Sequence, residues 1–211
     1  MKNNEFSDSE LKGKRLLGKR VVWFFLGSAC FIISQPLLRL PILEKLQQST
    51  DFMLAYALNP ILIGILIAFS AGLFEEGFRF LFKQFLLKPI ACPFAQPVIF
   101  GLGHGIAEAV YILGPAFQLI PPAQLELAVL ERVLAIILHV NLTVIVWNGF
   151  QKEQKGLYLL FAIAVHGGIN SLIPLLASHP NAIMLIEGAL FVMDLLLIVY
   201  AWRSRKYYVK E

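Results

Sequence analysis

Charged residues are scarce in this chain. Only 15% of its 211 residues are Asp, Glu, Lys or Arg, whereas 58% are hydrophobic. An ordinary soluble domain carries about 25% charged and about 45–50% apolar residues. The shortage of charge therefore excludes a typical water-soluble globule and indicates a chain that crosses a membrane several times.

Cysteines and basic stripes are also lacking. Two cysteines, Cys30 and Cys92, are too few for a disulfide framework and have no paired metal-binding spacing. The net charge of +4 comes from residues near the ends of apolar segments, so we expect no nucleic-acid partner. The first apolar segment lacks a convincing small-x-small cleavage site, which predicts that it remains as a span. Internal repeats and low-complexity tracts are absent from the sequence, which favours one integral domain.

Six apolar segments predict an all-α, polytopic transmembrane helical bundle. Most have roughly the 20 residues that an α-helix needs to cross about 30 Å of hydrocarbon. Proline residues fall at or near the segment boundaries, where helices are expected to end. The second segment is long enough to be tilted, kinked or divided into two half-spans. The segments are 21–38, 60–87, 97–114, 127–147, 157–177 and 183–201.

The distribution of Lys and Arg predicts that both termini lie in the cytoplasm. With the N-terminus inside, the inner segments hold 14 of the 18 basic residues, and the outer loops hold only Arg39 and Lys45. A seventh span would invert this pattern. We therefore expect a basic cytoplasmic tail at 1–20, an integral helical domain at 21–203 and a second basic tail at 204–211, in a multi-pass protein of the cell membrane.

Ionisable groups near the middle of four predicted spans are the main functional signal. An acidic or basic side chain at the bilayer centre costs about 2.5–3.5 kcal/mol, so such groups must be paired, neutralised or bound to something. Their similar depth on four different helices predicts one shared polar cavity. The groups are Glu75, Glu76 and Arg79 in the second span, His104 and Glu108 in the third, His139 in the fourth and His166 in the fifth.

Spacing along the helices supports this cavity. Arg79 lies four residues after Glu75 and three after Glu76, so it can reach either carboxylate on one helix face. His104 and Glu108 are also four residues apart, as are His166 and Asn170, so each pair can converge on one metal ion or one water molecule. Five glycines flank the histidines and predict close helix packing. These are Gly101, Gly103, Gly105, Gly167 and Gly168.

Four stretches in order resemble a known protein family. AGLFEEGFR, GLGHGIAEA, ERVLAIILH and AIAVHGGIN resemble the motifs of the YhfC intramembrane metalloproteases, relatives of the type II CAAX-prenyl-protease and PrsW superfamily. The resemblance covers about residues 26–200. It implies a membrane-embedded helical bundle in which a glutamate and histidines activate water for peptide hydrolysis.

The resemblance also implies roles for individual residues. Glu75 or Glu76 would be the catalytic base, and His104 would pair with it or bind metal. His166 and Asn170 would complete the site or stabilise the oxyanion. His139 and Glu108 match the YhfC pattern rather than that of the prenyl proteases. The prenyl-protease motif has three residues between the second Glu and the Arg, whereas this chain has two. That departure leaves open which glutamate is the base and which one Arg79 holds.

Two versions of the chemistry remain open, as do two other classes of function. His104, His139 and His166 could hold a divalent metal ion, with zinc favoured because imidazole suits it. A glutamate in apolar surroundings could also act as base without metal.

An ion- or proton-coupled transporter would need similar groups, although the chain lacks the repeats common in transporters. A non-catalytic scaffold or immunity-type membrane protein would keep them as structure. The expected partners are membrane lipid and a peptide or membrane-protein substrate.

Overall fold

The computed structural model describes residues 2–121 and 125–210, and the regular elements of that part of the chain are all helices, without strands. The loop predicted at 115–126 lies partly outside the described residues. The helices are α1 (Lys2–Ile32), α2 (Leu40–Gln47), α3 (Thr50–Leu58), α4 (Pro60–Leu81), α5 (Ala95–Leu119), α6 (Glu126–Gln151), α7 (Lys155–Leu176) and α8 (Ala182–Ser204), with π-helical η1 (Ile33–Arg39) and η2 (Phe82–Leu86) and 3-10 helical η4 (Arg205–Tyr207).

Six helical stretches of the described chain are long and apolar enough to cross a membrane, which confirms the predicted fold class. The protein is an integral, multi-pass membrane protein. The first stretch, Gly13–Gln47, runs beyond the predicted end at residue 38. A proline normally breaks a helix because it removes a backbone donor and clashes with the preceding turn. Here Pro36 lies within the wider π-helical turn of η1, and the helix continues into α2.

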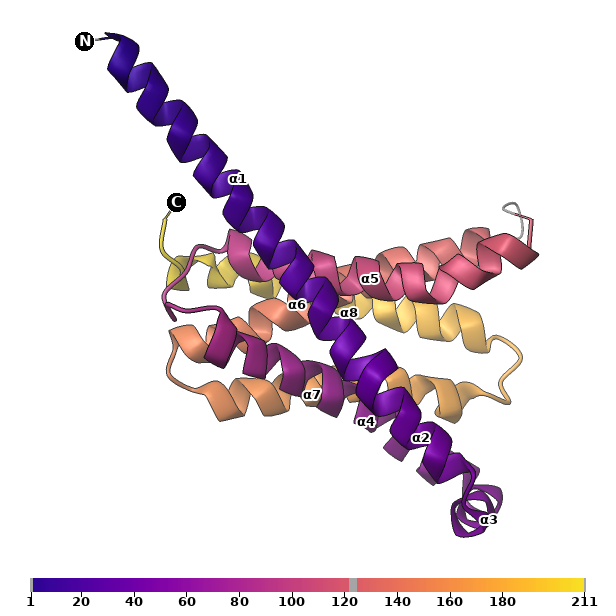
Figure 1. Ribbon diagram of the computed structural model, residues 1–211. Helices are drawn as coiled ribbons and strands as arrows, with labels where there is room; N and C mark the ends of the chain where they lie inside the picture. Colours follow the sequence, from indigo (N-terminus) through magenta and orange to yellow (C-terminus); the bar gives the residue numbers. More distant parts are fainter. Residues whose placement is uncertain (1, 122–124, 211) are drawn as a thin grey trace.

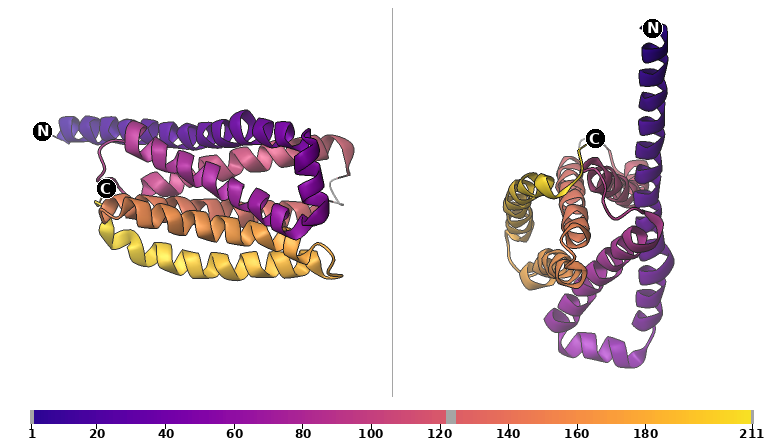
Figure 2. Two further views of the ribbon diagram at one scale, coloured as in Figure 1. Left: turned by 90° about the horizontal axis from the view of Figure 1, so that it is seen from below. Right: turned by 90° about the vertical axis from the view of Figure 1, so that its left-hand side faces the viewer.

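The six spans form a bundle with α6 at its centre (Figures 1 and 2). α6 contacts α5, α7 and α8, while α1 packs on α5 and α4 packs on α7. α1 crosses the other helices obliquely, and α3 lies crosswise at one end between α2 and α4 (Figure 2). Both termini lie at the opposite end of the bundle (Figure 1). Residues 2–20, predicted as a tail, form the beginning of α1 and project past the bundle.

Two glycines allow α1 and α5 to cross with their backbones in contact. A Cβ atom on Gly27 would lie 1.9 Å from the carbonyl oxygen of Phe100, and one on Gly103 would lie 2.0 Å from that of Phe24. Ser28 also donates a hydrogen bond of 2.9 Å from its hydroxyl to the Gly103 carbonyl. No side chain separates the helices here, and the Phe31 ring near the end of α1 lies 5.5 Å from the ring of His104, between centroids.

The other glycines predicted at helix contacts behave in two ways. A Cβ atom on Gly101 would lie 2.6 Å from the Val140 Cα atom of α6, and Gly105 meets α6 one turn later. Gly167 lies against the Phe69 ring of α4. These contacts confirm the prediction for α5 and for Gly167. The prediction is wrong for Gly168, where an added Cβ would meet no atom within 4 Å.

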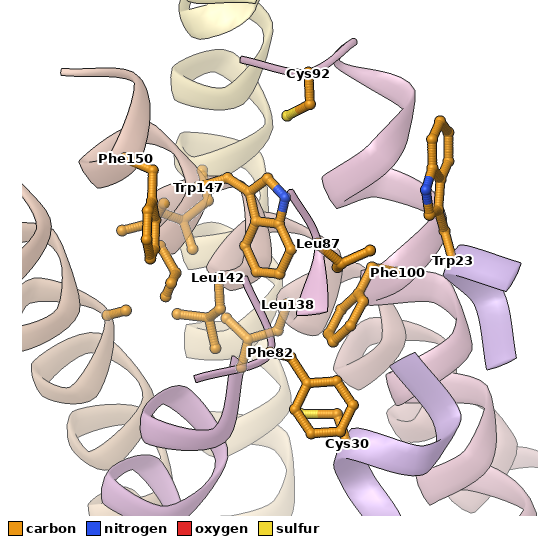
Figure 3. Packing of buried hydrophobic residues seen from close by; sticks show 14 of the residues in the cluster. Trp23, Cys30, Phe82, Leu87, Cys92, Phe100, Leu138, Leu142, Trp147 and Phe150 are labelled. Carbon is orange, nitrogen blue, oxygen red and sulfur yellow. The ribbon is translucent and has the colours of Figure 1, made fainter. Parts of the chain in front are cut away.

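Buried apolar side chains, among them Phe82, Phe100 and Trp147, pack together inside the bundle (Figure 3). The Phe100 ring lies 5.1 Å from the Trp147 ring and 5.9 Å from the Phe82 ring, between centroids. All three side chains are buried. They join η2, α5 and α6 into one rigid block, which fixes the helices that carry the charged residues of the site.

Candidate functional site

The ionisable groups predicted to share one cavity do meet inside the bundle. Glu75, Arg79, His104, His139 and His166 are all buried and come from four helices. The ring centroids of His104 and His139 are 5.0 Å apart, and those of His139 and His166 are 5.5 Å apart. The helical spacing of each motif, together with the glycine contacts, brings these side chains to one level of the bundle.

Glu75 lies at the centre of the cluster. Its Oε2 atom is 2.8 Å from His104 Nε2 and 3.5 Å from Arg79 Nη2. Its Oε1 atom accepts a hydrogen bond from the Gln35 side-chain amide and lies 3.9 Å from His166 Nε2. Donors from three other parts of the chain therefore converge on this one carboxylate and fix its orientation.

Glu76 is held differently. Its Oε1 atom pairs with Arg79 and lies 2.8 Å from His166 Nδ1, which is the donor in that contact. The residue has no exposed surface. Its carboxylate therefore neutralises the buried guanidinium and orients the imidazole of His166, so that Nε2 faces Glu75.

Glu108 and His139 form the second half of the cluster. Arg79 Nη2 lies 2.7 Å from His139 Nδ1, so Nδ1 accepts that bond and Nε2 is directed at Glu108, with which it pairs. The other oxygen of Glu108 accepts a hydrogen bond of 3.0 Å from Arg132. Arg132 was not among the residues predicted for the site.

A cavity of about 620 Å³ opens on this cluster. Glu75, Glu108, His139 and His166 line it, and so does the half-buried Asn170, one turn beyond His166 on α7. Its other walls are mostly apolar and come from α1, η1, α2, α3, α4, α5, α6, α7 and α8. Glu76 and Arg79 lie behind the wall rather than on it. The two adjacent glutamates are therefore not equivalent, because only Glu75 is presented to the cavity.

Sequence reasoning missed Gln35 and Arg39, which η1 contributes to the site. Gln35 Nε2 lies 2.5 Å from Glu75 Oε1, and Arg39 Nη1 donates to Gln35 Oε1 at 2.9 Å. Arg39 is itself held by Ser70 and by the Ile67 carbonyl, at 2.9 and 2.8 Å. The sequence does contain a signal for this contact. Gln35 precedes Pro36 within an apolar segment, and a buried polar group in a span requires a partner.

The donor atoms of the site fit a divalent cation. One donor atom each from Glu75, His104, Glu108 and His139 lies within 4.8 Å of the others. This set differs from the predicted three histidines: it includes two carboxylates and leaves out His166, which lies beside it. Carboxylate oxygens and imidazole nitrogens are both ligands that zinc accepts.

The balance of buried charges in the site also favours a bound cation. Glu75 and Glu76 are buried beside a single buried guanidinium, that of Arg79. Glu108 adds a third carboxylate and shares Arg132 with Glu131. Buried charges are costly unless they are balanced. With neutral histidines the cluster has an excess of negative charge, which a bound cation or a protonated imidazole would offset.

Comparison with known proteins agrees with this geometry. The family model described as "YhfC intramembrane metalloprotease" matches residues 11–120 and 112–193. The chain is also similar to the "Uncharacterized membrane protein YhfC" of Bacillus subtilis (strain 168), with 25% identity over 229 residues that cover 90% of this chain and 88% of the relative. The matched regions contain all four motifs of the site. The chain belongs to the YhfC intramembrane metalloprotease family.

Proposed function

We propose that this protein hydrolyses peptide bonds of a membrane-embedded or membrane-proximal substrate, with Glu75 as the general base. The observation that carries the proposal is the position of Glu75: it is the buried carboxylate on which donors converge, and it lines the cavity. The family name points to the same reaction class. A cavity of about 620 Å³ has room for a short stretch of extended peptide.

The geometry divides the work between the two glutamates. Glu75 faces the cavity and can exchange a proton with a water molecule there. Glu76 is paired with Arg79 and bonded to His166, so it holds the guanidinium and one imidazole in place. Arg79 in turn contacts His139, which keeps that ring directed at Glu108. Glu76 and Arg79 are thus positioning residues.

The proposed reaction needs one proton acceptor and one oxyanion donor. Glu75 takes a proton from water as the water oxygen attacks the scissile carbonyl carbon. The carbonyl oxygen gains negative charge, which donors on the cavity wall stabilise. The side-chain amide of Asn170 is the available donor on α7, because the Nδ1–H of His166 is already bonded to Glu76 and its Nε2 atom would donate only in the protonated imidazolium. Glu75 then returns the proton to the leaving amine as the carbon–nitrogen bond breaks.

Glu75, His104, Glu108 and His139 would hold a metal ion if one is bound. A zinc ion in such a site acts as a Lewis acid and lowers the pKa of bound water to about 7. The roles of Gln35, Glu76, Arg79 and Asn170 are the same with or without the ion, because these residues orient the ligands or contact the substrate.

The test is proteolysis by the purified, full-length protein in proteoliposomes. The wild type and a Glu75→Gln variant are incubated with co-reconstituted membrane proteins, and new N-termini are identified by mass spectrometry. New N-termini are expected with the wild type and not with the variant. Identical products from both proteins would contradict the proposal. Ion flux into sealed vesicles, lost in Glu75→Gln, would instead favour a transporter.

A further inference from the structure

A second cavity lies at the opposite end of the bundle from α3, near the C-terminus. It has a volume of about 540 Å³ and is enclosed by the start of α5 and by the end of α8 with the residues that follow. Val98, Ile99 and Trp202 form an apolar wall, whereas Arg205 and Lys210 bring positive charge. None of these residues belongs to the site around Glu75.

The rim of this cavity is fixed by tertiary contacts. The Val209 backbone N–H donates to the Cys92 carbonyl at 3.2 Å, and the Tyr208 hydroxyl donates to Asn148 Oδ1 at 2.8 Å. The rings of Phe94 and Tyr208 pack edge to face with centroids 5.2 Å apart. The residues after α8 are therefore attached to the bundle and give the cavity a defined shape.

The cationic groups of the cavity have no acidic counterpart in the described chain. The Arg205 guanidinium lies over the Trp202 ring at 4.4 Å and over the Phe94 ring at 5.7 Å. Among the side chains that the structure describes, those of residues 13–121 and 125–210, no carboxylate forms an ion pair with Arg205 or Lys210. Stacking holds the guanidinium in place and leaves its N–H donors free to bind an anion.

Two features place this cavity at the level of lipid headgroups. Trp202 is 69% exposed although it ends an apolar span, and tryptophan and tyrosine gather at membrane–water interfaces. Most of the basic residues of the chain lie at the same end of the spans, which is typical of the cytoplasmic side. Basic pockets between helices on that side bind anionic headgroups.

We propose that this cavity binds an anionic phospholipid. The headgroup phosphate accepts hydrogen bonds from Arg205 and Lys210, and an acyl chain lies along Val98, Ile99 and Trp202. The apolar wall is what distinguishes a lipid from a free anion, since an inorganic phosphate would leave that wall uncovered. The inference does not depend on the proposed protease activity.

The experiment measures lipid retention by the full-length protein. Protein in mild detergent is exchanged into phosphatidylglycerol or into phosphatidylcholine with the same acyl chains, and bound lipid is counted by native mass spectrometry. We expect retained phosphatidylglycerol. The double variant Arg205→Gln/Lys210→Gln should lower the apparent affinity about tenfold or more, since each basic residue near a membrane surface contributes about 1 kcal/mol. No retention of phosphatidylglycerol by the wild type would overturn the proposal.

A matched control separates this cavity from general attraction to anionic lipid. The double variant Arg203→Gln/Lys206→Gln removes the same charge at the same end of the chain, but neither residue lines the cavity. It should retain lipid as the wild type does. Equal loss in both double variants would mean diffuse electrostatic attraction only. Displacement of the lipid by an equal concentration of glycerol phosphate, which has no acyl chain, would mean a site for free phosphate.

Discussion

The side-chain amide of Gln35 donates a hydrogen bond of 2.5 Å to Glu75 Oε1. Arg39 donates to the carbonyl oxygen of that same amide at 2.9 Å, so the amide nitrogen must face Glu75. This chain of contacts connects the first span to the centre of the site. It also leaves the Oε2 atom of Glu75 to His104, so each carboxylate oxygen has its own fixed donor.

The first prediction is that Gln35→Leu lowers kcat with little change in KM. A hydrogen bond that orients a catalytic or metal-binding group typically contributes 10–100-fold in activity or affinity. We therefore expect kcat to fall by a factor in that range. Steady-state kinetics on a substrate identified by its new N-termini would measure it. Gln96→Leu is the control, because Gln96 is also a buried glutamine but bonds Lys83 and Trp147 away from the cavity. Equal kcat for Gln35→Leu and wild type would contradict the positioning role.

The second prediction separates the two adjacent glutamates. Glu75→Gln should abolish proteolysis with a smaller loss of stability, because the one carbonyl oxygen of glutamine can still accept the bond from Gln35. Glu76→Gln should lower the free energy of unfolding by about 3 kcal/mol, because Arg79 then loses the nearer of its two buried carboxylates. Thermal unfolding in detergent, measured beside activity, gives both values. Equal stability loss in the two variants would show that the glutamates are equivalent.

The membrane fold and most of the site could be predicted from the sequence because both depend on local patterns. Long apolar segments give the six spans, and spacing of three or four residues places Arg79 beside Glu75 and Glu76. Charged groups in four such segments can avoid the cost of burial by meeting one another. This reasoning leads to the cluster of His104, His139 and Glu75 without knowledge of the packing.

The parts that could not be predicted depend on packing between distant segments. The wide turn of η1 keeps the first span helical past Pro36 and directs Gln35 inward, and no short-range pattern specifies it. The different roles of Glu75 and Glu76 follow from the rotation of α4 against α7. Helical spacing alone lets either carboxylate reach Arg79, so it could not decide between them.

The third prediction concerns the crossing of α1 and α5. Gly103→Ala should lower the free energy of unfolding by about 3 kcal/mol or more, because the new methyl group meets backbone atoms of Phe24 that cannot move aside. Gly168→Ala is the control, since an added Cβ there meets no atom within 4 Å. It should be neutral or slightly stabilising, because alanine favours helix more than glycine does. Thermal unfolding of both variants checks this, and equal effects would contradict the observed crossing.

The fourth prediction concerns the loop between η2 and α5. Burial raises the pKa of the Cys92 thiol, and the nearby Lys83 ammonium lowers it by less. A raised pKa means less thiolate at a given pH, and the thiolate is the reactive form. In a Cys30→Ser background, Cys92 should therefore react slowly with a maleimide at pH 7–8 and rapidly after denaturation in detergent. Ala91→Cys, combined with Cys30→Ser and Cys92→Ser, is the control, because Ala91 is exposed. Equal rates at the two positions would contradict the burial of the Cys92 side chain.

The fifth prediction distinguishes two sets of metal ligands. If the site binds zinc through Glu75, His104, Glu108 and His139, His104→Ala should lower the zinc content well below the wild-type value of about one ion per chain. His166→Ala should keep the metal, because His166 lies outside that set and its Nδ1 atom is bonded to Glu76. It should still lose activity, since the His166 ring lines the cavity beside Glu75.

Metal analysis by mass spectrometry, with a chelator titration of each variant, measures the zinc content and its dependence on each histidine. Equal loss of zinc in the two variants would instead support the three-histidine set, and full activity of metal-free wild type in chelator would assign the chemistry to Glu75 alone.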